Sequence, residues 1–207
     1  DAMAGLLPAS RRPGLAGDKM HKLAGLLRAD DADAAYRGLV SHWTDPAALV
    51  TGGREQPSAV WDAAAAIPDF TERMAFLDSM TYLPDDILHK VDRASMSVSL
   101  EARVPLLDHR LVEFAWSLPP HMRLRDGQGK WLLRQVLYRH VPRDIIDRPK
   151  AGFAVPVGAW LRGPLRDWAE DLLDERRLRE EGWFDAAMVR SAWDAHLAGR
   201  GNHWQAI

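Results

Sequence analysis

The feature that most constrains the fold is a helical spacing of apolar residues, which runs through almost the whole chain and is interrupted at prolines and glycines. Apolar side chains recur three or four residues apart, which places them on one face of an α-helix. The predicted helices cover residues 14–29, 32–43, 58–66, 84–100, 107–118, 130–141 and 143–147, with one more from Asp69 and three from Val157 onward. No strand of convincing length is predicted. The sequence therefore indicates a mostly α fold.

Prolines and glycines predict where these helices begin and end. Pro84 followed by two acids predicts a helix start, because proline suits the first helical turn and acids complement the positive end of the helix dipole. That helix should end near Leu100, before the Val104-Pro105 step. Residues 45–57 are predicted to form a connection and residues 127–129 a turn. Breaks are expected after Val157 at Gly163-Pro164, Gly182 and Gly199, and the chain is predicted to end within a helix at Ile207.

Composition excludes several classes of function. A chain of 207 residues is long enough for one domain with a buried core, and a formal charge of −2 gives no reason to expect a nucleic-acid partner. With no cysteine, disulfides, thiolate metal sites and a cysteine nucleophile are absent from these residues. No apolar stretch reaches the roughly 18 residues that a membrane span needs. We expect a cytoplasmic protein without a membrane segment.

The aromatic and histidine residues favour structural roles. Nine tryptophans are spread along the chain without an interleaved basic groove, so helix packing is favoured over stacking on nucleic-acid bases. The eight histidines are scattered, and none lies three or four residues from another, which argues against a histidine metal site. No metal site is therefore predicted.

One helical segment is unusual because charges lie beside its apolar stripe. Lys90 and Arg93 are three residues apart and share a helix side with that stripe. The stripe consists of Ile87, Val91, Ala94 and Val98. Charges this close to an apolar face must pair or find an anion. Two interpretations stay open: an ion-pair network that fixes the helix ends, or a basic wall that faces a phosphate or carboxylate. The residues alone favour the network, in which Glu101, Arg103 and Asp108 also belong.

Two loops could approach a ligand. In Arg148–Pro156, Pro149 stiffens the chain before Lys150, and Gly152 permits a close backbone approach. A lysine held there could neutralise a leaving phosphate, although a lone lysine is usually a solvated surface group. The Gly52-Gly53 pair could form an anion-binding nest, but an ordinary loop is favoured.

Taken together, two segments resemble a known family. The first reads Tyr82-Leu83-Pro84-Asp85-Asp86-Ile87-Leu88-x-Lys90-Val91-Asp92-Arg93-x-Ser95-Met96, followed by Leu100-Glu101-Ala102-Arg103-Val104-Pro105-Leu106-Leu107-Asp108. The second reads Arg148-Pro149-Lys150-x-Gly152-Phe153. Both resemble the synthetase domain of glutamine-hydrolysing asparagine synthetases, closely from Tyr82 to about Trp160 and loosely elsewhere.

The resemblance implies a two-domain enzyme. Its glutaminase domain releases ammonia by means of a terminal cysteine, and its synthetase domain uses ATP and Mg²⁺ to activate L-aspartate as β-aspartyl-AMP. Ammonia then displaces AMP. This chain has no cysteine, and Thr51-Gly52-Gly53-Arg54-Glu55 does not match the family's pyrophosphate loop. By the resemblance, residues 1–207 are a partial synthetase domain, truncated at both ends and inactive alone, and most ATP and Mg²⁺ contacts lie upstream.

The resemblance also assigns a fold and roles. The chain would be the C-terminal helical part of an α/β adenine-nucleotide-binding domain of the PP-loop pyrophosphatase type, and a homodimer is allowed. Lys150 would be catalytic, Asp92 and Arg93 would bind substrate, and Glu101, Arg103 and Asp108 would form the ion-paired frame behind them. Related adenylating enzymes, such as β-lactam synthetases or lasso-peptide cyclases, remain alternatives. A non-catalytic helical interaction module is a third.

Overall fold

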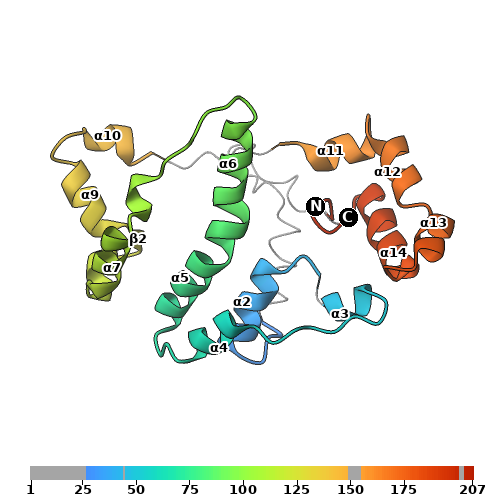
Figure 1. Ribbon diagram of the computed structural model, residues 1–207, viewed down its shortest axis with the longest axis horizontal. Helices are drawn as coiled ribbons and strands as arrows, with labels where there is room; N and C mark the ends of the chain where they lie inside the picture. Colours follow the sequence, from blue (N-terminus) through green and yellow to red (C-terminus); the bar gives the residue numbers. More distant parts are fainter. Residues whose placement is uncertain (1–26, 44, 149–154, 201–202) are drawn as a thin grey trace, which may run out of the picture. The chain divides into compact units, whose positions relative to one another are not determined.

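The computed structural model describes residues 27–43, 45–148, 155–200 and 203–207 (Figure 1). The predicted helix over residues 14–29 lies almost entirely outside these ranges. The chain divides into two compact units, which are described separately below. Unit 1 contains residues 1–57 and 154–207, and unit 2 contains residues 58–153.

Unit 1 is built from short helices with aspartate caps. Its elements are α2 (Ala32–Val40), α3 (Pro46–Leu49), α11 (Val157–Arg162), α12 (Arg166–Leu172), α13 (Glu175–Glu181) and α14 (Ala186–Leu197). Four of these helices begin after an aspartate whose carboxylate accepts a backbone N–H of the first turn, which satisfies a donor that the helix itself cannot pair. These caps are Asp31, Asp45, Asp174 and Asp185.

The core of unit 1 surrounds Trp193, which is fully buried in α14. Leu161 and Ala169 complete this cluster, and Trp204 and Ile207 pack against it. A second cluster contains Leu178, Ala186 and Val189, with Leu49 and Leu173 against it. Burying these side chains holds four otherwise marginal helices of six to twelve residues together.

Backbone hydrogen bonds join the two sequence segments of unit 1. The N–H of Thr51 donates to the carbonyl of Trp183 at 3.0 Å, and the N–H of Asp185 donates to the carbonyl of Leu49 at 2.8 Å. The indole N–H of Trp43 donates to the carbonyl of Ala206 at 3.0 Å. The segment after α3 is therefore fixed against the turn between α13 and α14.

Unit 2 consists of helices and one very short hairpin. The helices are α4 (Ala59–Ala65), α5 (Phe70–Met80), the π-helix η3 (Leu83–Leu88), α6 (His89–Met96), the 3₁₀-helix η4 (Pro105–Leu107), α7 (His109–Ser117), α8 (Pro120–Arg123), α9 (Trp131–Leu137) and α10 (Arg143–Ile146). Between α8 and α9, β1 (Leu124–Arg125) pairs antiparallel with β2 (Gln128–Gly129) around the predicted turn. The mostly α composition predicted from the sequence is confirmed for the described residues.

The predicted helix start at Pro84 is wrong. Pro84 lies inside a nearly continuous helical run from α5 through η3 to α6, which Figure 1 draws as one long rod. Proline has no N–H for the usual bond to the residue four positions earlier, and its ring collides with that carbonyl in a regular α-helix. The wider π-helical turn makes room for the proline ring and does not require the missing hydrogen bond, so the helix continues past Pro84.

Three other boundaries differ from the prediction. Residues 45–57 contain the one-turn helix α3, because Asp45 caps it and Pro46 suits its first turn. Four helices rather than three follow Val157, since Asp174 caps α13 and separates it from α12. The chain end is a turn around Trp204 and not a helix.

The tryptophans do not all pack in the core, contrary to the prediction. Trp193 is fully buried, but Trp116, Trp160, Trp168 and Trp183 are exposed, the last at 68%. Helix packing was favoured because the tryptophans lack an interleaved basic groove, and that argument does not show which of them find a packing partner. None of the helices in the described ranges combines the length and the apolar character that a membrane span needs.

Candidate functional site

The first candidate region is α6, which carries Asp92 and Arg93. Both residues are exposed, and within the described residues neither side chain makes a hydrogen bond or an ion pair. Lys90 differs from them, because its ammonium lies 2.5 Å from a carboxylate oxygen of Asp86 one turn earlier. This hydrogen bond raises the pKa of Lys90. On this helix Arg93, and not Lys90, is the cation free to meet an anion.

The predicted apolar stripe of this helix is exposed. Ile87, Val91 and Val98 are 36%, 42% and 75% exposed. Only Val91 lies on α6 itself, because Ile87 belongs to the π-helix η3 and Val98 to the turn that follows α6, and unit 2 does not bury these side chains. The charges beside the stripe therefore lie in water, where solvent screening leaves an ion pair with little effect on stability.

The proposed frame residues form two separate pairs. The guanidinium of Arg103 donates to both carboxylate oxygens of Glu101, at 2.9 and 3.2 Å, and both side chains are largely exposed. Asp108 instead accepts from the guanidinium of Arg110 at 2.6 and 2.9 Å and from its backbone N–H at 3.0 Å, which caps α7. These bonds hold the pKa of the Asp108 carboxyl below its usual range. The structure thus brings Glu101 and Arg103 together and does not join Asp108 to them.

A second region precedes the lysine segment. Asp147, directly after α10, accepts at one carboxylate oxygen from the guanidinium of Arg134 at 2.6 Å and from the hydroxyl of Tyr138 at 2.7 Å. Arg134 lies on α9, and Tyr138 caps the C-terminal end of that helix one turn later. Arg143 places its guanidinium 4.5 Å from the ring centroid of Tyr138, within the range of a cation–π contact. The cluster therefore ties α9 to α10.

Sequence reasoning missed this cluster. Arg134 and Tyr138 fell within the helix predicted over residues 130–141, and Asp147 ended the one predicted over residues 143–147, and none of the three was given a role. The available signal was the i, i+4 spacing of an arginine and a tyrosine, followed by an acid just before the Arg148-Pro149-Lys150 motif. Lys150 itself, the candidate catalytic residue, lies outside the described residues.

The glycine pair considered as an anion nest forms a tight turn. The N–H of Gly53 donates to the carbonyl of Val50 at 2.7 Å, so this donor is already used. A Cβ at Gly53 would lie 2.8 Å from both the Cβ and the carbonyl oxygen of Val50. Gly52 has a positive φ of 67°, which glycine adopts at little cost. The turn itself therefore accounts for glycine at both positions, without a bound anion.

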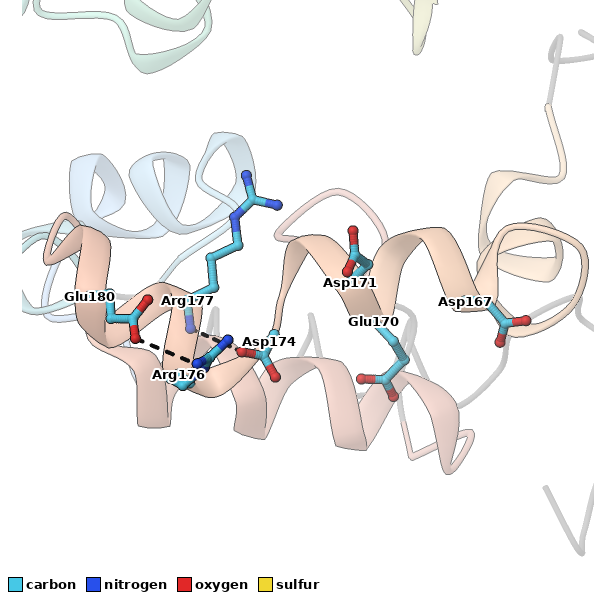
Figure 2. Close-up of a pocket in the computed structure, with 7 residues that line it drawn as sticks. All are labelled: Asp167, Glu170, Asp171, Asp174, Arg176, Arg177 and Glu180. Atoms are coloured by element: carbon cyan, nitrogen blue, oxygen red, sulfur yellow. Dashed lines mark hydrogen bonds and ion pairs between the residues drawn. The ribbon is translucent and has the colours of Figure 1, made fainter.

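Unit 1 carries a polar hollow on α12 and α13 (Figure 2). It is lined by Asp167, Glu170, Asp171, Asp174, Arg176, Arg177 and Glu180. Most of these charges have partners: Asp174 caps α13, Arg177 pairs with Glu181 at 2.8 Å, and Arg176 lies 3.9 Å from Glu180. In Figure 2 the carboxylates of Asp167, Glu170 and Asp171 point in different directions.

These side chains do not converge on a metal. Across the described ranges there is no group of three or more histidines and acids that could hold an ion. Glu170 is engaged elsewhere, because the guanidinium of Arg190 donates to it at 2.7 Å and lowers the pKa of its carboxyl. The indole N–H of Trp193 also lies near this carboxylate and favours its ionised form, but its geometry falls short of a hydrogen bond. The hollow is a solvated charged surface.

Comparison with known proteins gives a consistent result. A model of the family described as asparagine synthase matches residues 2–207. The chain is 35% identical to asparagine synthetase [glutamine-hydrolyzing] 1 of Bacillus subtilis over 50% of its length and 16% of that protein. It is 37% identical to a putative asparagine synthetase of Mycobacterium tuberculosis over 70% of its length and 21% of that protein. It thus spans about a fifth of these curated relatives. No solved structure matches significantly.

Proposed function

Because the chain belongs to the asparagine synthase family, we propose that it forms part of an ATP-dependent ligase that converts aspartate to asparagine. The ligase activates aspartate as β-aspartyl-AMP, and ammonia derived from glutamine displaces AMP. The observation that carries this proposal is the family match over residues 2–207, which includes both motif segments. The α/β domain of the PP-loop type, the glutaminase domain, the cytoplasmic location and the homodimer all belong to the same proposal.

In this proposal the described residues contribute little to the binding of ATP and Mg²⁺. The described residues do not fit a resident Mg²⁺, since no group of three or more acids and histidines among them converges. We therefore assign no step of the reaction on this chain to the metal. The main contacts to ATP and Mg²⁺ are proposed to lie upstream, as the resemblance implies.

Lys150 is the proposed catalytic residue. An ammonium placed beside the leaving pyrophosphate stabilises the negative charge that develops as the phosphorus–oxygen bond breaks. The motif Arg148-Pro149-Lys150 supports this role, because a proline restricts its own backbone and that of the residue before it, and both precede the lysine.

Arg93 and Asp92 are proposed to bind aspartate. The exposed guanidinium of Arg93 is unpaired within the described residues and can donate two parallel hydrogen bonds to a carboxylate. Lys90 is not free for this task because it is paired with Asp86. Behind them, Glu101 with Arg103 and Asp108 with Arg110 are proposed to keep the helix ends in place.

The test measures aspartate-dependent exchange of labelled pyrophosphate into ATP by the whole protein, including the upstream part that the resemblance implies. We expect exchange in the wild type, a loss of roughly 100-fold or more in Lys150→Ala, and a raised KM for aspartate in Arg93→Ala. Arg176→Ala removes a charge in unit 1 whose side chain is 85% exposed and serves as the control, with activity expected to be unchanged.

Each outcome separates the alternatives. Exchange that depends on a different carboxylic acid would favour a related adenylating enzyme. Absence of exchange with every acid would favour a non-catalytic interaction module. Exchange that survives Lys150→Ala would refute the catalytic assignment while leaving the family membership unaffected.

A further inference from the structure

We propose that Pro84 is a positioning residue: by keeping η3 in the π-helical form, it sets the side of the helical rod on which Asp92 and Arg93 stand. This inference rests on the proposed binding of aspartate by these two residues. Pro84 does not touch the substrate in this proposal and acts only through the direction in which α6 points its side chains.

The first argument is that α5, η3 and α6 form one rod within unit 2, which Figure 1 shows. Backbone hydrogen bonds continue across the junction between α5 and η3. The N–H of Thr81 donates to the carbonyl of Leu77, and the N–H of Asp85 donates to the carbonyl of Thr81, both at 2.9 Å. Leu77 is buried, which fixes α5 within the unit. The direction of each side chain on α6 therefore depends on how many residues the rod uses between the two α-helices.

The second argument is the angle that one residue adds. An α-helix closes each hydrogen bond over four residues and a π-helix over five, so a π-helical turn holds one extra residue. Each residue of an α-helix turns the chain by about 100°. If η3 were α-helical, α6 would be turned by that angle relative to α5. Asp92 would then take the direction that Arg93 has now, and the apolar Val91 would take the direction of Asp92.

The third argument is that Pro84 excludes the α-helical form of η3. Its nitrogen carries no hydrogen to donate to the carbonyl of Met80, and its ring would collide with that carbonyl in a regular α-helix. An alanine at this position would supply the N–H and remove the collision. Since π-helices are rare, we expect the rod with alanine at this position to change to the commoner α-helix.

The fourth argument is that α6 passes a rotation on to the substrate-binding residues. The last turn of α6 is held at the carbonyls of these same residues. The N–H of Ser97 donates to the carbonyl of Arg93 at 3.1 Å, and the hydroxyl of Ser95 donates to the carbonyl of Asp92 at 3.2 Å. Helix α6 therefore turns as one body, and Asp92 and Arg93 turn with it.

The competing interpretation is that the π-helical turn only accommodates a proline and has no effect on binding. The two interpretations predict different combinations of stability and affinity. Alanine is a better helix former than proline, so both interpretations expect Pro84→Ala to keep or raise the thermal stability of the protein. Only the positioning role predicts that the same variant binds aspartate more weakly.

The first experiment measures pyrophosphate exchange by the whole protein. In Pro84→Ala we expect KM for aspartate to rise about 10- to 100-fold with kcat nearly unchanged, because a carboxylate replaces the guanidinium that meets the substrate. Deleting the exposed Asp85 in this background removes the extra residue, turns α6 back and should return KM close to the wild-type value. Pro120→Ala, at the first position of α8 in the same unit, is the control and should leave KM unchanged. A KM that Pro84→Ala does not raise, or that the deletion does not recover, overturns the inference.

The second experiment does not depend on activity. This chain contains no cysteine, so spin labels can be attached to cysteines introduced at the exposed positions Ala75 in α5 and His89 in α6, once any upstream cysteine is replaced by serine. We expect Pro84→Ala to change the distance between the labels by several ångströms, because α6 turns by about 100°, and the added deletion of Asp85 to reverse the change. An unchanged distance in Pro84→Ala overturns the inference whatever the activity. A wild type without exchange, whose label distance responds in this way, would refute the proposed function and leave the effect of Pro84 on α6 intact.

Discussion

His196 offers a sharp test of how unit 1 is held together. It is fully buried in α14, and its Nε2 donates to the carbonyl of Gly158 in α11 at 3.1 Å. Its Nδ1 accepts from the backbone N–H of His203 and from the guanidinium of Arg162, both at 3.3 Å. Arg162 in turn donates to the carbonyl of His196 at 2.7 Å. This arrangement needs a neutral imidazole that carries its proton on Nε2.

Replacing His196 by leucine keeps the volume roughly constant and removes the bonds made by the ring, whereas the bond from Arg162 to the backbone carbonyl stays. The carbonyl of Gly158 and the N–H of His203 lose their partner in a site with little access to water. The lost bonds to Gly158 and His203 contribute about 1 kcal/mol each, and an unsatisfied buried group costs about 1–3 kcal/mol. The leucine recovers part of this through apolar burial. We expect His196→Leu to lower the free energy of unfolding by about 2–4 kcal/mol.

The dependence on pH provides a second, independent measure. Burial, followed by the positive charge of Arg162, lowers the pKa of His196 below the ordinary value of a histidine, 6.5. The unfolded chain then binds a proton that the folded chain excludes, so the stability of the wild type rises with pH in this range. The contribution of the neutral His196 ring to stability is fully present above the pKa of histidine in the unfolded chain. It is lost as the pH falls from about 7.5 through 6.5 and below. The leucine variant should lack this contribution.

The assay is urea unfolding at pH 5.5 and pH 8.0, combined with hydrogen exchange of the amides in α14. Faster hydrogen exchange of the α14 amides would show that the loss of stability occurs in unit 1. His140→Leu, which replaces an exposed histidine in unit 2, is the control and should change little. We assign His196 as a neutral ring whose Nδ1 accepts two hydrogen bonds. A His196→Leu variant as stable as the wild type at pH 8.0 would refute this assignment, and so would one whose stability falls with acid as much as that of the wild type.

Three further predictions concern stability and are checked by urea unfolding. Leu77→Ala empties a site that is 1% exposed in the core of unit 2 and should cost about 2–5 kcal/mol; a cost under 0.5 kcal/mol would mean that the site is not packed. Asp69→Ala removes the carboxylate that caps α5 and should cost about 1 kcal/mol, whereas Ser58→Ala, at a cap without a side-chain bond, should cost much less. Glu170→Gln should be less stable than the wild type near pH 7, and the difference should shrink below pH 4.5, because the bond to Arg190 lowers the carboxyl pKa. A difference independent of pH would contradict that cause.

The sequence predicted most of what depends on neighbours along the chain. Helical spacing gave the helical character of the described residues and most helix positions, since periodicity is a local property. It failed at Pro84, because the i→i+5 turn that tolerates a proline is not visible in a pattern based on 3.6 residues per turn. It also missed the break before α13, because a single capping aspartate outweighed the continuing periodicity.

The candidate site divides in the same way. The two motif segments were recognisable from residue order alone, because a family signature is a property of the sequence, and the family match covers both. Their roles were assigned to Lys150, Asp92 and Arg93 by resemblance. That Lys90 is already paired with Asp86, and Arg93 is not paired within the described residues, required the structure.

By itself the sequence determined the helical composition, the family and the residues at which a function can be tested. Only the tertiary structure decided that the carboxylate of Asp147 meets Arg134 and Tyr138, and that His196 is buried as a neutral ring. The physical reason is distance along the chain. Helix formation and capping join residues within one or two turns, whereas the Nε2 of His196 bonds a carbonyl 38 residues earlier. No local pattern records such a contact, because it exists only when separate helices pack together.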